Sequence, residues 1–377
     1  MKKKIYYWGP FLDKVGTIRA IYNSAESLNK YSNEFEGVII NAAGEWDKLP
    51  NLDRKLNIIK LNANYYENLP RYSFIKSRFS YIKIFFKSFF PLKKLIQKDQ
   101  PEYLIAHLIV SLPMILFILF KFKTKLCLRV SGKVKLNFLR RILWKISAKN
   151  IEKVFCPTVE TKNQLIQEKI FNKDKISVLR DPIIKIKEYF KMKIESDFKS
   201  SFFPDNIILL GRLTRQKNFG LFINAFAKIQ EKFPELKVNI FGDGELRKNL
   251  QKKINQYNLE KKIILHGSVD NVFKYLKKSK IFISSSLWED PGASIMEAAF
   301  CDTLILSSDC PSGPKEFLSY GKGGFIFENN SEASLINSLE SAIQCKSTIK
   351  KQKMINAKKN LKPYTFFNHY VSLSEQL

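Results

Sequence analysis

Short apolar runs recur along the whole chain and alternate with longer stretches whose apolar residues are spaced as on a helix. In the first half, strands are predicted at 5–8, 37–40, 56–61, 103–106, 126–130 and 154–156, and a helix at 18–28. In the second half, strands are predicted at 206–210, 237–241, 263–265, 281–283 and 303–306, with helices at 219–233, from 245, at 272–278 and at 294–300. This alternation favours parallel sheets flanked by helices.

The pattern predicts an α/β protein with two Rossmann-like, doubly wound domains. We expect an amino-terminal domain over 1–190 and a carboxy-terminal domain over 191–359, with the polar stretch 185–204 as the linker. The last helix, about 360–377, is expected to pack back on the first domain. Ligands of such sheets bind at the carboxyl ends of the strands, so a cleft between the two domains is the expected site.

Composition removes several classes of protein. The 31 Phe and 15 Tyr among 377 residues are too apolar for a disordered chain, and 15 Gly with 14 Pro are too few for collagen-like repeats. The five cysteines are scattered and form no CxxC pair, which disfavours a disulfide framework or a zinc site and fits a reducing compartment. No secretory signal is expected, because Trp8-Gly9-Pro10 interrupts the segment that would have to be apolar.

The positive charge is concentrated in one segment. The chain carries a net charge of +29, and residues 71–149 hold 18 Lys and Arg against only Asp99 and Glu102. Large aromatic residues are interleaved with these cations, as in a helix that lies on an anionic lipid surface. A solvated basic face over an ordinary Phe-rich core is the alternative. Nucleic acid also attracts cations, but no helix-turn-helix, zinc-finger, RNP or GXXG pattern is present.

A basic loop follows the predicted strand at 206–210. It contains Gly211, Arg212, Arg215 and Lys217 and precedes a helix. Forked Arg donors, a Lys point charge and free backbone N–H groups suit an anionic phosphate. In so basic a chain, a solvated loop without a ligand is the alternative.

A second motif places two carboxylates around a loop-to-helix junction. Glu289 precedes the tight turn at Pro291-Gly292, Ser294 is the predicted N-cap, and Glu297 is expected in the first helical turn. Carboxylates accept hydrogen bonds from sugar hydroxyls, so the pair could hold two sugars. A helix start with favourable acidic residues explains Glu297 alone but not the whole motif.

These motifs resemble the GT4 family of retaining glycosyltransferases. The order and spacing of Gly211-Arg212…Lys217-Asn218, Gly242-Asp243-Gly244, His266-Gly267 and Glu289…Glu297 carry the resemblance, mainly over about 205–330. It implies the GT-B fold, in which two Rossmann-like domains face each other across a cleft. It also implies a hexosyltransferase that keeps the anomeric configuration.

The resemblance implies roles for the carboxy-terminal residues. Arg212 and Lys217 would bind the donor diphosphate and neutralise the leaving group, Glu289 would contact the transferred sugar, and Glu297 would hold the ribose. The remaining implied contacts are backbone near the sugar and phosphates at Gly292, Ala293 and Ser294, a turn beside the nucleotide at Gly242 and Gly244, and backbone near the base around His266.

Two amino-terminal residues also match. Gly16 would let its loop approach the diphosphate, and His107 would lie near the donor sugar as a catalytic residue alongside Glu289, Arg212 and Lys217. A core histidine is the alternative for His107. No metal or other cofactor is expected, because the cations would stabilise the departing diphosphate and the chain has no DxD motif.

The loop from Asp309 to Glu316 looks like the subgroup that builds bacterial surface glycans such as lipopolysaccharide from UDP-linked hexoses or N-acetylhexosamines. We therefore expect a cytoplasmic enzyme, peripheral on the inner face of the cell membrane, that glycosylates a polyprenyl-phosphate-linked oligosaccharide or a polysaccharide precursor. Two alternatives stay open. One is a soluble GT-B enzyme acting on a free sugar, and the other is a non-enzymatic protein that binds nucleotide sugars or nucleic acid.

Overall fold

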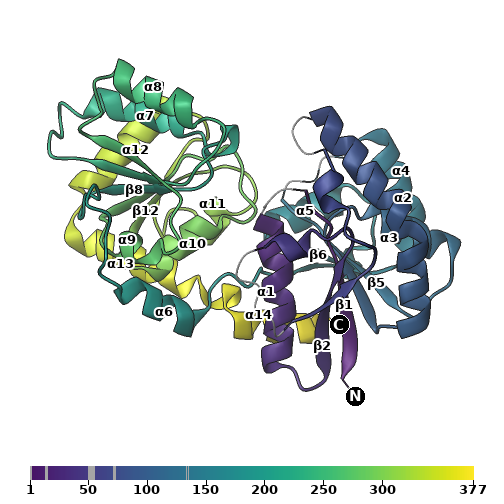
Figure 1. Ribbon diagram of the computed structural model, residues 1–377. Coiled ribbons are helices and arrows are strands. Elements are labelled where there is room, and N and C mark those ends of the chain that lie inside the picture. Colours follow the sequence, from purple (N-terminus) through teal and green to yellow (C-terminus); the bar gives the residue numbers. More distant parts are fainter. Residues whose placement is uncertain (1, 13–15, 50–55, 71–73, 133, 135) are drawn as a thin grey trace. The chain divides into compact units, whose positions relative to one another are not determined.

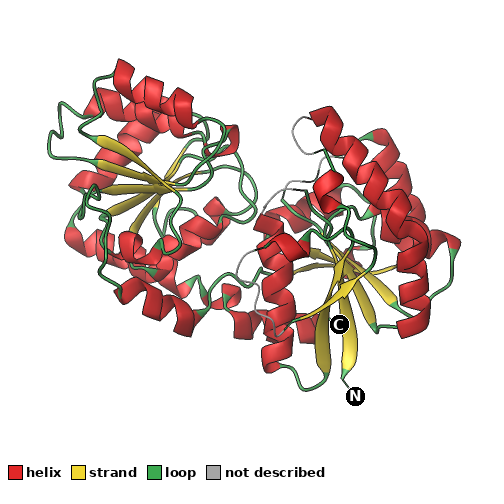
Figure 2. Ribbon diagram, viewed as in Figure 1, coloured by secondary structure: helices red, strands yellow, loops and turns green. Residues whose placement is uncertain are grey.

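The computed structural model describes residues 2–12, 16–49, 56–70, 74–132, 134 and 136–377. The chain forms two compact units. The amino-terminal unit comprises Met1–Pro182 and Phe366–Leu377, and the carboxy-terminal unit comprises Ile183–Thr365. Each unit is a parallel sheet covered by helices on both faces (Figures 1 and 2), as the alternating pattern predicts.

The amino-terminal sheet has the strand order β3-β2-β1-β4-β5-β6-β7. Its strands are β1 (Lys3–Trp8), β2 (Phe35–Asn41), β3 (Asn57–Lys60), β4 (Tyr103–Ala106), β5 (Lys125–Arg129), β6 (Ile151–Cys156) and β7 (Ile176–Val178). All neighbouring strands run parallel. The order reverses between β1 and β4, so the loops that follow these two strands diverge at a topological switch point.

Successive side chains of β1 face opposite layers of helices. Tyr6 and Trp8 join the core beneath α2, α3 and α4, whereas Ile5 and Tyr7 join the core beneath α1 and α14. The helices of this unit are α1 (Gly16–Tyr31), α2 (Phe74–Asp99), α3 (Ser111–Leu119), α4 (Phe138–Ser147), α5 (Val159–Gln167) and α14 (Phe366–Gln376). Burial on both faces explains why the strand is apolar without a break.

The carboxy-terminal sheet has the strand order β10-β9-β8-β11-β12-β13. Its strands are β8 (Ile207–Leu210), β9 (Val238–Phe241), β10 (Ile263–Gly267), β11 (Ile281–Ser284), β12 (Leu304–Ser308) and β13 (Phe325–Phe327). Its helices are α6 (Ile186–Ile194), α7 (Phe219–Ile229), α8 (Arg247–Gln256), α9 (Phe273–Lys277), α10 (Ala293–Phe300), α11 (Pro314–Phe317), α12 (Glu332–Gln344) and α13 (Ser347–Lys359). Figure 1 shows α7, α8 and α12 on one face and α9, α10 and α13 on the other.

The predicted linker is wrong. Residues 185–204 include α6, which packs in the carboxy-terminal unit, so the expected boundary at 190 falls inside a helix. The chain instead changes units after Pro182 and returns at Phe366. A polar stretch predicts a linker only when its few apolar residues have no packing partner. Here Tyr189 of α6 is buried against Phe273, with ring centroids 4.2 Å apart, so the stretch is part of the folded unit.

The last helix, α14, belongs to the amino-terminal unit. Helix α1 contacts the chain at both points where it passes between the units, at Pro182 and at Phe366. The Asn23 amide donates to the Pro182 carbonyl at 2.6 Å, and the Ser27 hydroxyl donates to the Phe366 carbonyl at 2.6 Å. The Ser24 hydroxyl lies 2.7 Å from Nε2 of His369 in α14. Buried polar residues on one face of α1 therefore fix the returning helix.

The predicted basic aromatic segment corresponds largely to α2, α3 and α4. Residues 71–73, Lys133 and Lys135 of this segment lie outside the described residues, as does Val15 beside Gly16. The stretch 104–120 is β4, a loop and α3, so the predicted strand at 103–106 is present. Among the described residues, no helix combines the length and the hydropathy that a membrane span requires.

Candidate active site

The carboxy-terminal sheet reverses its strand order between β8 and β11. The loop after β8 carries Arg212 and Lys217, and the loop after β11 carries Glu289. Because parallel strands present their carboxyl ends at the same edge, the sheet brings the two sequence motifs together. A doubly wound sheet binds ligands at this edge.

Lys217 and Glu289 contact each other directly. The Lys217 Nζ lies 2.6 Å from the Glu289 Oε1, and their side chains are 15% and 5% exposed. The Ser286 hydroxyl donates to the same carboxylate oxygen at 2.6 Å. A carboxylate this deeply buried needs such partners, because an unpaired buried charge is strongly destabilising.

Backbone contacts hold the two loops in register. The Leu287 N–H donates to the Gln216 carbonyl at 2.8 Å, and the Gln216 side-chain amide donates to the Trp288 carbonyl at 2.9 Å. The Ser285 hydroxyl donates to the Lys217 carbonyl at 2.9 Å. Arg212 is exposed on the same loop, with its guanidinium 3.5 Å from the Gln216 side-chain oxygen. Both predicted phosphate-binding cations therefore lie on one loop, which hydrogen bonds to the loop after β11 hold in place.

The glycines of this edge are required by close backbone packing. Gly242 has φ +128°, and a Cβ there would lie 1.9 Å from the Gly211 carbonyl oxygen. A Cβ on Gly244 would lie 2.6 Å from the Leu213 carbonyl oxygen. The Gly242 N–H also donates to the Gly267 carbonyl at 2.9 Å. Gly242 and Gly244 thus let the loops after β8 and β9 pack against each other, as expected of turn residues.

The second carboxylate motif starts its helix differently from the prediction. Gly292, with φ +97°, occupies the N-cap position of α10, so the predicted N-cap Ser294 already lies inside the helix. Glu297 consequently lies in the second turn rather than the first, and it is 8% exposed. A left-handed φ at the junction is available to Gly at little cost, which explains why Gly and not Ser begins the helix.

The loop from Asp309 to Glu316, which the sequence analysis did not connect with Glu289, supports this junction. A Cβ on Gly313 would lie 2.3 Å from the Pro291 carbonyl oxygen, and the Glu289 N–H donates to the Pro311 carbonyl at 3.2 Å. The segment from Cys310 to Gly313 therefore supports the Glu289 loop from the side of β12. Gln216 and Ser286 are further site residues that the motif analysis missed, since no spacing rule marks a neutral polar side chain.

The His266 ring is held entirely by protein groups. Its Nε2 lies 3.0 Å from the Asn239 Oδ1, its Nδ1 lies 3.3 Å from the Ser201 hydroxyl, and the ring stacks on Phe241. Burial, together with the charge of Lys199, lowers the pKa of His266 to about 4. The imidazole is therefore neutral at pH 7. Its hydrogen bonds and its stacking on Phe241 fix the end of β10, which indicates a structural role.

Gly16 and His107 lie in the amino-terminal unit. Gly16 is the exposed first residue of α1, and a Cβ there would meet no atom within 4 Å. His107 follows β4 at the switch point of that sheet and is 8% exposed. Among the described residues, neither ring nitrogen of His107 has a hydrogen-bond partner. Burial and then the Arg129 charge lower the pKa of His107 well below its usual value.

Comparison with known proteins relates the carboxy-terminal unit to a protein family. Residues 193–361 match the family described as Glycosyl transferases group 1. Over this stretch, the chain is similar to the glycosyl transferases group 1. The matched range contains Arg212, Lys217, Glu289 and Glu297, so the motifs that carry the resemblance lie inside the family region. The expected relationship to glycosyltransferases is confirmed.

Two relatives match mainly this group 1 region. An uncharacterized glycosyltransferase of Methanocaldococcus jannaschii is 38% identical over 149 residues, which are 39% of this chain and 36% of the relative. A Campylobacter jejuni N-acetylgalactosamine-N,N'-diacetylbacillosaminyl-diphospho-undecaprenol 4-alpha-N-acetylgalactosaminyltransferase is 30% identical over 138 residues, 37% of each chain. The chain thus matches little more than a third of the length of these relatives.

Solved structures extend the likeness to the whole chain at the level of fold. A mutant of Staphylococcus aureus TarM, solved in complex with Fondaparinux, alpha-GlcNAc-glycerol and UDP, has a TM-score of 0.75 and 15% identity, covering 99% of each chain. The chain therefore has the GT-B fold, with two Rossmann-like domains, as predicted.

Proposed function

We propose that the chain is a retaining, metal-independent glycosyltransferase that moves a hexose or N-acetylhexosamine from a UDP-sugar to a lipid-linked or surface-polysaccharide precursor. The observation that carries this proposal is the buried Lys217–Glu289 contact, 2.6 Å long, at the switch point of the group 1 domain. It puts a Lys ammonium and a carboxylate side by side, and in this proposal the first would meet the diphosphate and the second the sugar.

The donor would lie along the edge formed by β8 and β11. Arg212 and Lys217 would bind the diphosphate, and the backbone N–H groups at the start of α10, from Ala293 and Ser294, would add donors. Glu289 would bind the transferred sugar and Glu297 the ribose. As the glycosidic bond breaks, negative charge grows on the departing diphosphate, and preorganised cations stabilise that charge in the transition state.

Relatives support this choice of substrates. One solved neighbour was crystallised with UDP, and the Campylobacter relative is named for a diphospho-undecaprenol acceptor and an N-acetylgalactosaminyl group. Both names describe those proteins, and we extend them to this chain because its residues 193–361 match the glycosyl transferases group 1. We also assign His107 a role as a neutral hydrogen-bonding group for the donor sugar.

We also propose that α2 docks the enzyme on an anionic membrane surface. Phe79, Ile82, Phe86 and Phe90 are 65%, 52%, 71% and 63% exposed, and their spacing puts them on one face of the helix. Exposed lysines, including Lys83, flank this stripe. Exposed rings can enter the headgroup boundary while the cations attract acidic lipids. The enzyme would then be peripheral on the inner face of the cell membrane.

Donor hydrolysis by the full chain tests the enzymatic proposal. UDP- and GDP-sugars would be incubated with the protein, with and without EDTA, and release of the nucleotide diphosphate followed. We expect release from a UDP-sugar that EDTA leaves unchanged. The variant Arg212→Gln should lower the rate at least about tenfold, because it removes charge-assisted hydrogen bonds. Arg215→Gln, an exposed cation of the same loop, is the matched control. Equal rates for both variants would reject the assigned diphosphate site.

A further inference from the structure

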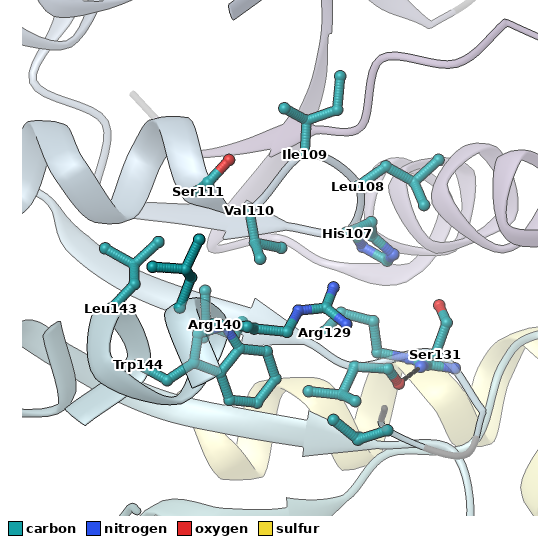
Figure 3. A pocket seen from close by; sticks show the side chains of 14 residues that line it. His107, Leu108, Ile109, Val110, Ser111, Arg129, Ser131, Arg140, Leu143 and Trp144 are labelled. Atoms are coloured by element: carbon teal, nitrogen blue, oxygen red, sulfur yellow. Dashed lines mark hydrogen bonds between the residues drawn. The ribbon is translucent and has the colours of Figure 1, made fainter. Parts of the chain in front are cut away.

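The amino-terminal unit contains a pocket of about 560 Å³ beside His107 (Figure 3). It lies at the carboxyl ends of β4 and β5, and α4 forms another wall with Arg140, Leu143 and Trp144. Its volume is within the range of small-molecule sites, about 300–1,000 Å³. All of its described lining residues belong to the amino-terminal unit, whereas the proposed donor residues Arg212, Lys217 and Glu289 belong to the carboxy-terminal unit.

Two arginines line this pocket and make it suited to an anion. Arg129 is buried and fixed by Asp181, with a guanidinium-to-carboxylate distance of 2.6 Å. Arg140 lies with its guanidinium carbon 5.5 Å from the centre of the Trp144 ring. The described residues that line the pocket include no carboxylate. A phosphate group in the pocket would therefore meet Arg140 and the Asp181-paired Arg129, with no carboxylate in the described lining itself.

The rest of the lining is mainly aliphatic and continues onto an exposed helix face. Leu139 lines the pocket and is 74% exposed at its mouth. On the adjoining side of α4, Phe138, Ile142 and Ile146 are 76%, 40% and 52% exposed. The helix begins firmly, because the Asn137 side chain accepts from the Arg140 N–H at 2.9 Å. An apolar path thus leads from the arginines to the surface.

His107 supplies a polar group at the other side of the lining. The residue is 8% exposed, and its two ring nitrogens have no partner among the described residues. Because its imidazole is neutral at pH 7, one ring nitrogen can accept a hydrogen bond from a hydroxyl. An unpartnered buried polar group is costly, which indicates that a ligand group completes it.

We propose that this pocket binds an acceptor that is the phosphate ester of a long hydrocarbon alcohol. Arg140 and Arg129 would hold the phosphate, and the hydrocarbon chain would leave over Leu139 and the exposed face of α4. A hydroxyl of the group attached to the phosphate would point toward His107. This assignment rests on the proposed function, since the ligand is the acceptor of that reaction, and it selects the lipid-phosphate class over a free sugar.

Binding to the full chain tests the pocket without requiring turnover. Isothermal titration would use farnesyl monophosphate, dodecyl phosphate below its micelle concentration, farnesol and inorganic phosphate. We expect saturable binding of a lipid phosphate and at least tenfold weaker binding of farnesol and of inorganic phosphate, because both parts of the ligand contribute. Binding of farnesyl monophosphate alone would narrow the class to isoprenoid phosphates. Equal binding of inorganic phosphate, or of farnesol, would overturn the proposal.

Two neighbouring arginines give a matched pair of variants. Arg140→Gln should weaken lipid-phosphate binding about tenfold or more, because a charge-assisted contact is lost. Arg141→Gln removes the same charge from the same helix, but Arg141 pairs with Glu168 and does not line the pocket, so binding should change less than about twofold. Equal effects of the two variants would reject the pocket as the phosphate site.

The same preparations separate the two proposals. UDP binding would be titrated alongside, together with circular dichroism to show that each variant folds. Lipid-phosphate binding without UDP binding would retain the pocket and reject the proposed enzyme. UDP binding and donor hydrolysis without lipid-phosphate binding would reject the pocket and retain the enzyme.

Discussion

Lys217 and Glu289 are 72 positions apart in the chain, yet their charged atoms lie 2.6 Å apart. Each is the residue that its own motif marks for a different part of the donor, the diphosphate or the sugar. In the structure, the two side chains neutralise each other. A phosphate oxygen that approached Lys217 would share the Lys217 ammonium with Glu289. The carboxylate would hold the ammonium in place, and the remaining N–H donors of Lys217 could bind the ligand.

Removing the charge of Glu289 should therefore lower the rate of donor hydrolysis strongly and the stability of the fold only moderately. Glu289→Gln keeps the side-chain size but leaves Lys217 with a neutral partner. We expect donor hydrolysis to fall about 100-fold or more and the free energy of unfolding to fall by roughly 1–3 kcal/mol. Initial rates and denaturant titration would measure both. Glu328→Gln, an exposed glutamate of the same unit, should change neither quantity. A Glu289→Gln enzyme with normal turnover would contradict the assignment.

The packing at Gly242 should make that position intolerant of any side chain. A Cβ there would lie 1.9 Å from the Gly211 carbonyl oxygen at a φ of +128°. We expect Gly242→Ala to destabilise the protein by roughly 2–4 kcal/mol, from the clash and from backbone strain together. Thermal unfolding would register the loss.

Gly220 offers the opposite result with the same substitution. It lies inside α7, and a Cβ there would have only the Lys253 Cε, at 4.0 Å, as a neighbour. Gly220→Ala should stabilise the protein by about 0.5–1 kcal/mol, because alanine favours a helix over the unfolded chain. If both alanine variants shifted stability in one direction, the close packing at Gly242 would not explain its effect.

Acid should weaken the packing of α14 on α1, because His369 becomes protonated. The His369 Nδ1 donates to the Arg180 carbonyl at 2.6 Å, so Nε2 must accept from Ser24, and burial lowers the pKa of His369 to about 4. Since the unfolded histidine has a pKa near 6.5, the unfolded state binds more protons as the pH falls. The stabilisation is complete above about pH 6.5 and is lost progressively toward pH 4, by about 3 kcal/mol.

Thermal unfolding between pH 7.5 and pH 4 would measure this loss. Other groups titrate in the same range, so the comparison is with His369→Gln, which has no charge to gain. We expect the variant to be less stable at pH 7.5 and to lose less stability on acidification than the parent protein. Identical pH slopes for the two proteins would show that His369 does not contribute.

The exposed stripe of α2 should determine membrane binding. Phe86 is 71% exposed, and burial of one Phe side chain contributes about 1.5–3 kcal/mol. We expect Phe86→Ser to weaken binding to vesicles that contain acidic lipid about tenfold, and 0.5 M salt to weaken the binding of the parent protein. Phe190→Ser, at a 56% exposed Phe of α6, is the control. Vesicle co-sedimentation would contradict the prediction if the two variants behaved alike.

Periodicity predicted most strands because burial on both sides leaves an unmistakable apolar run, as in Ile207–Leu210. It missed α6, because most residues of this helix are charged or exposed and only Tyr189 is buried. It also gave Ser294 the N-cap position that Gly292 occupies, because a composition rule favours Ser there, whereas the observed turn needs a positive φ. Local rules fail where the backbone follows a tertiary constraint.

Apolar spacing and motif spacing are local properties, so the helices and strands and the residues of the two motifs could be read from the sequence. Which of these residues meet depends on how the chain folds over long distances. Lys217 reaches Glu289, and Ser24 reaches His369 across 345 positions, because the strand order and the return of the chain at Phe366 bring them together. No local pattern encodes those neighbours, because the free energy that selects them comes from burying whole faces of the sheets.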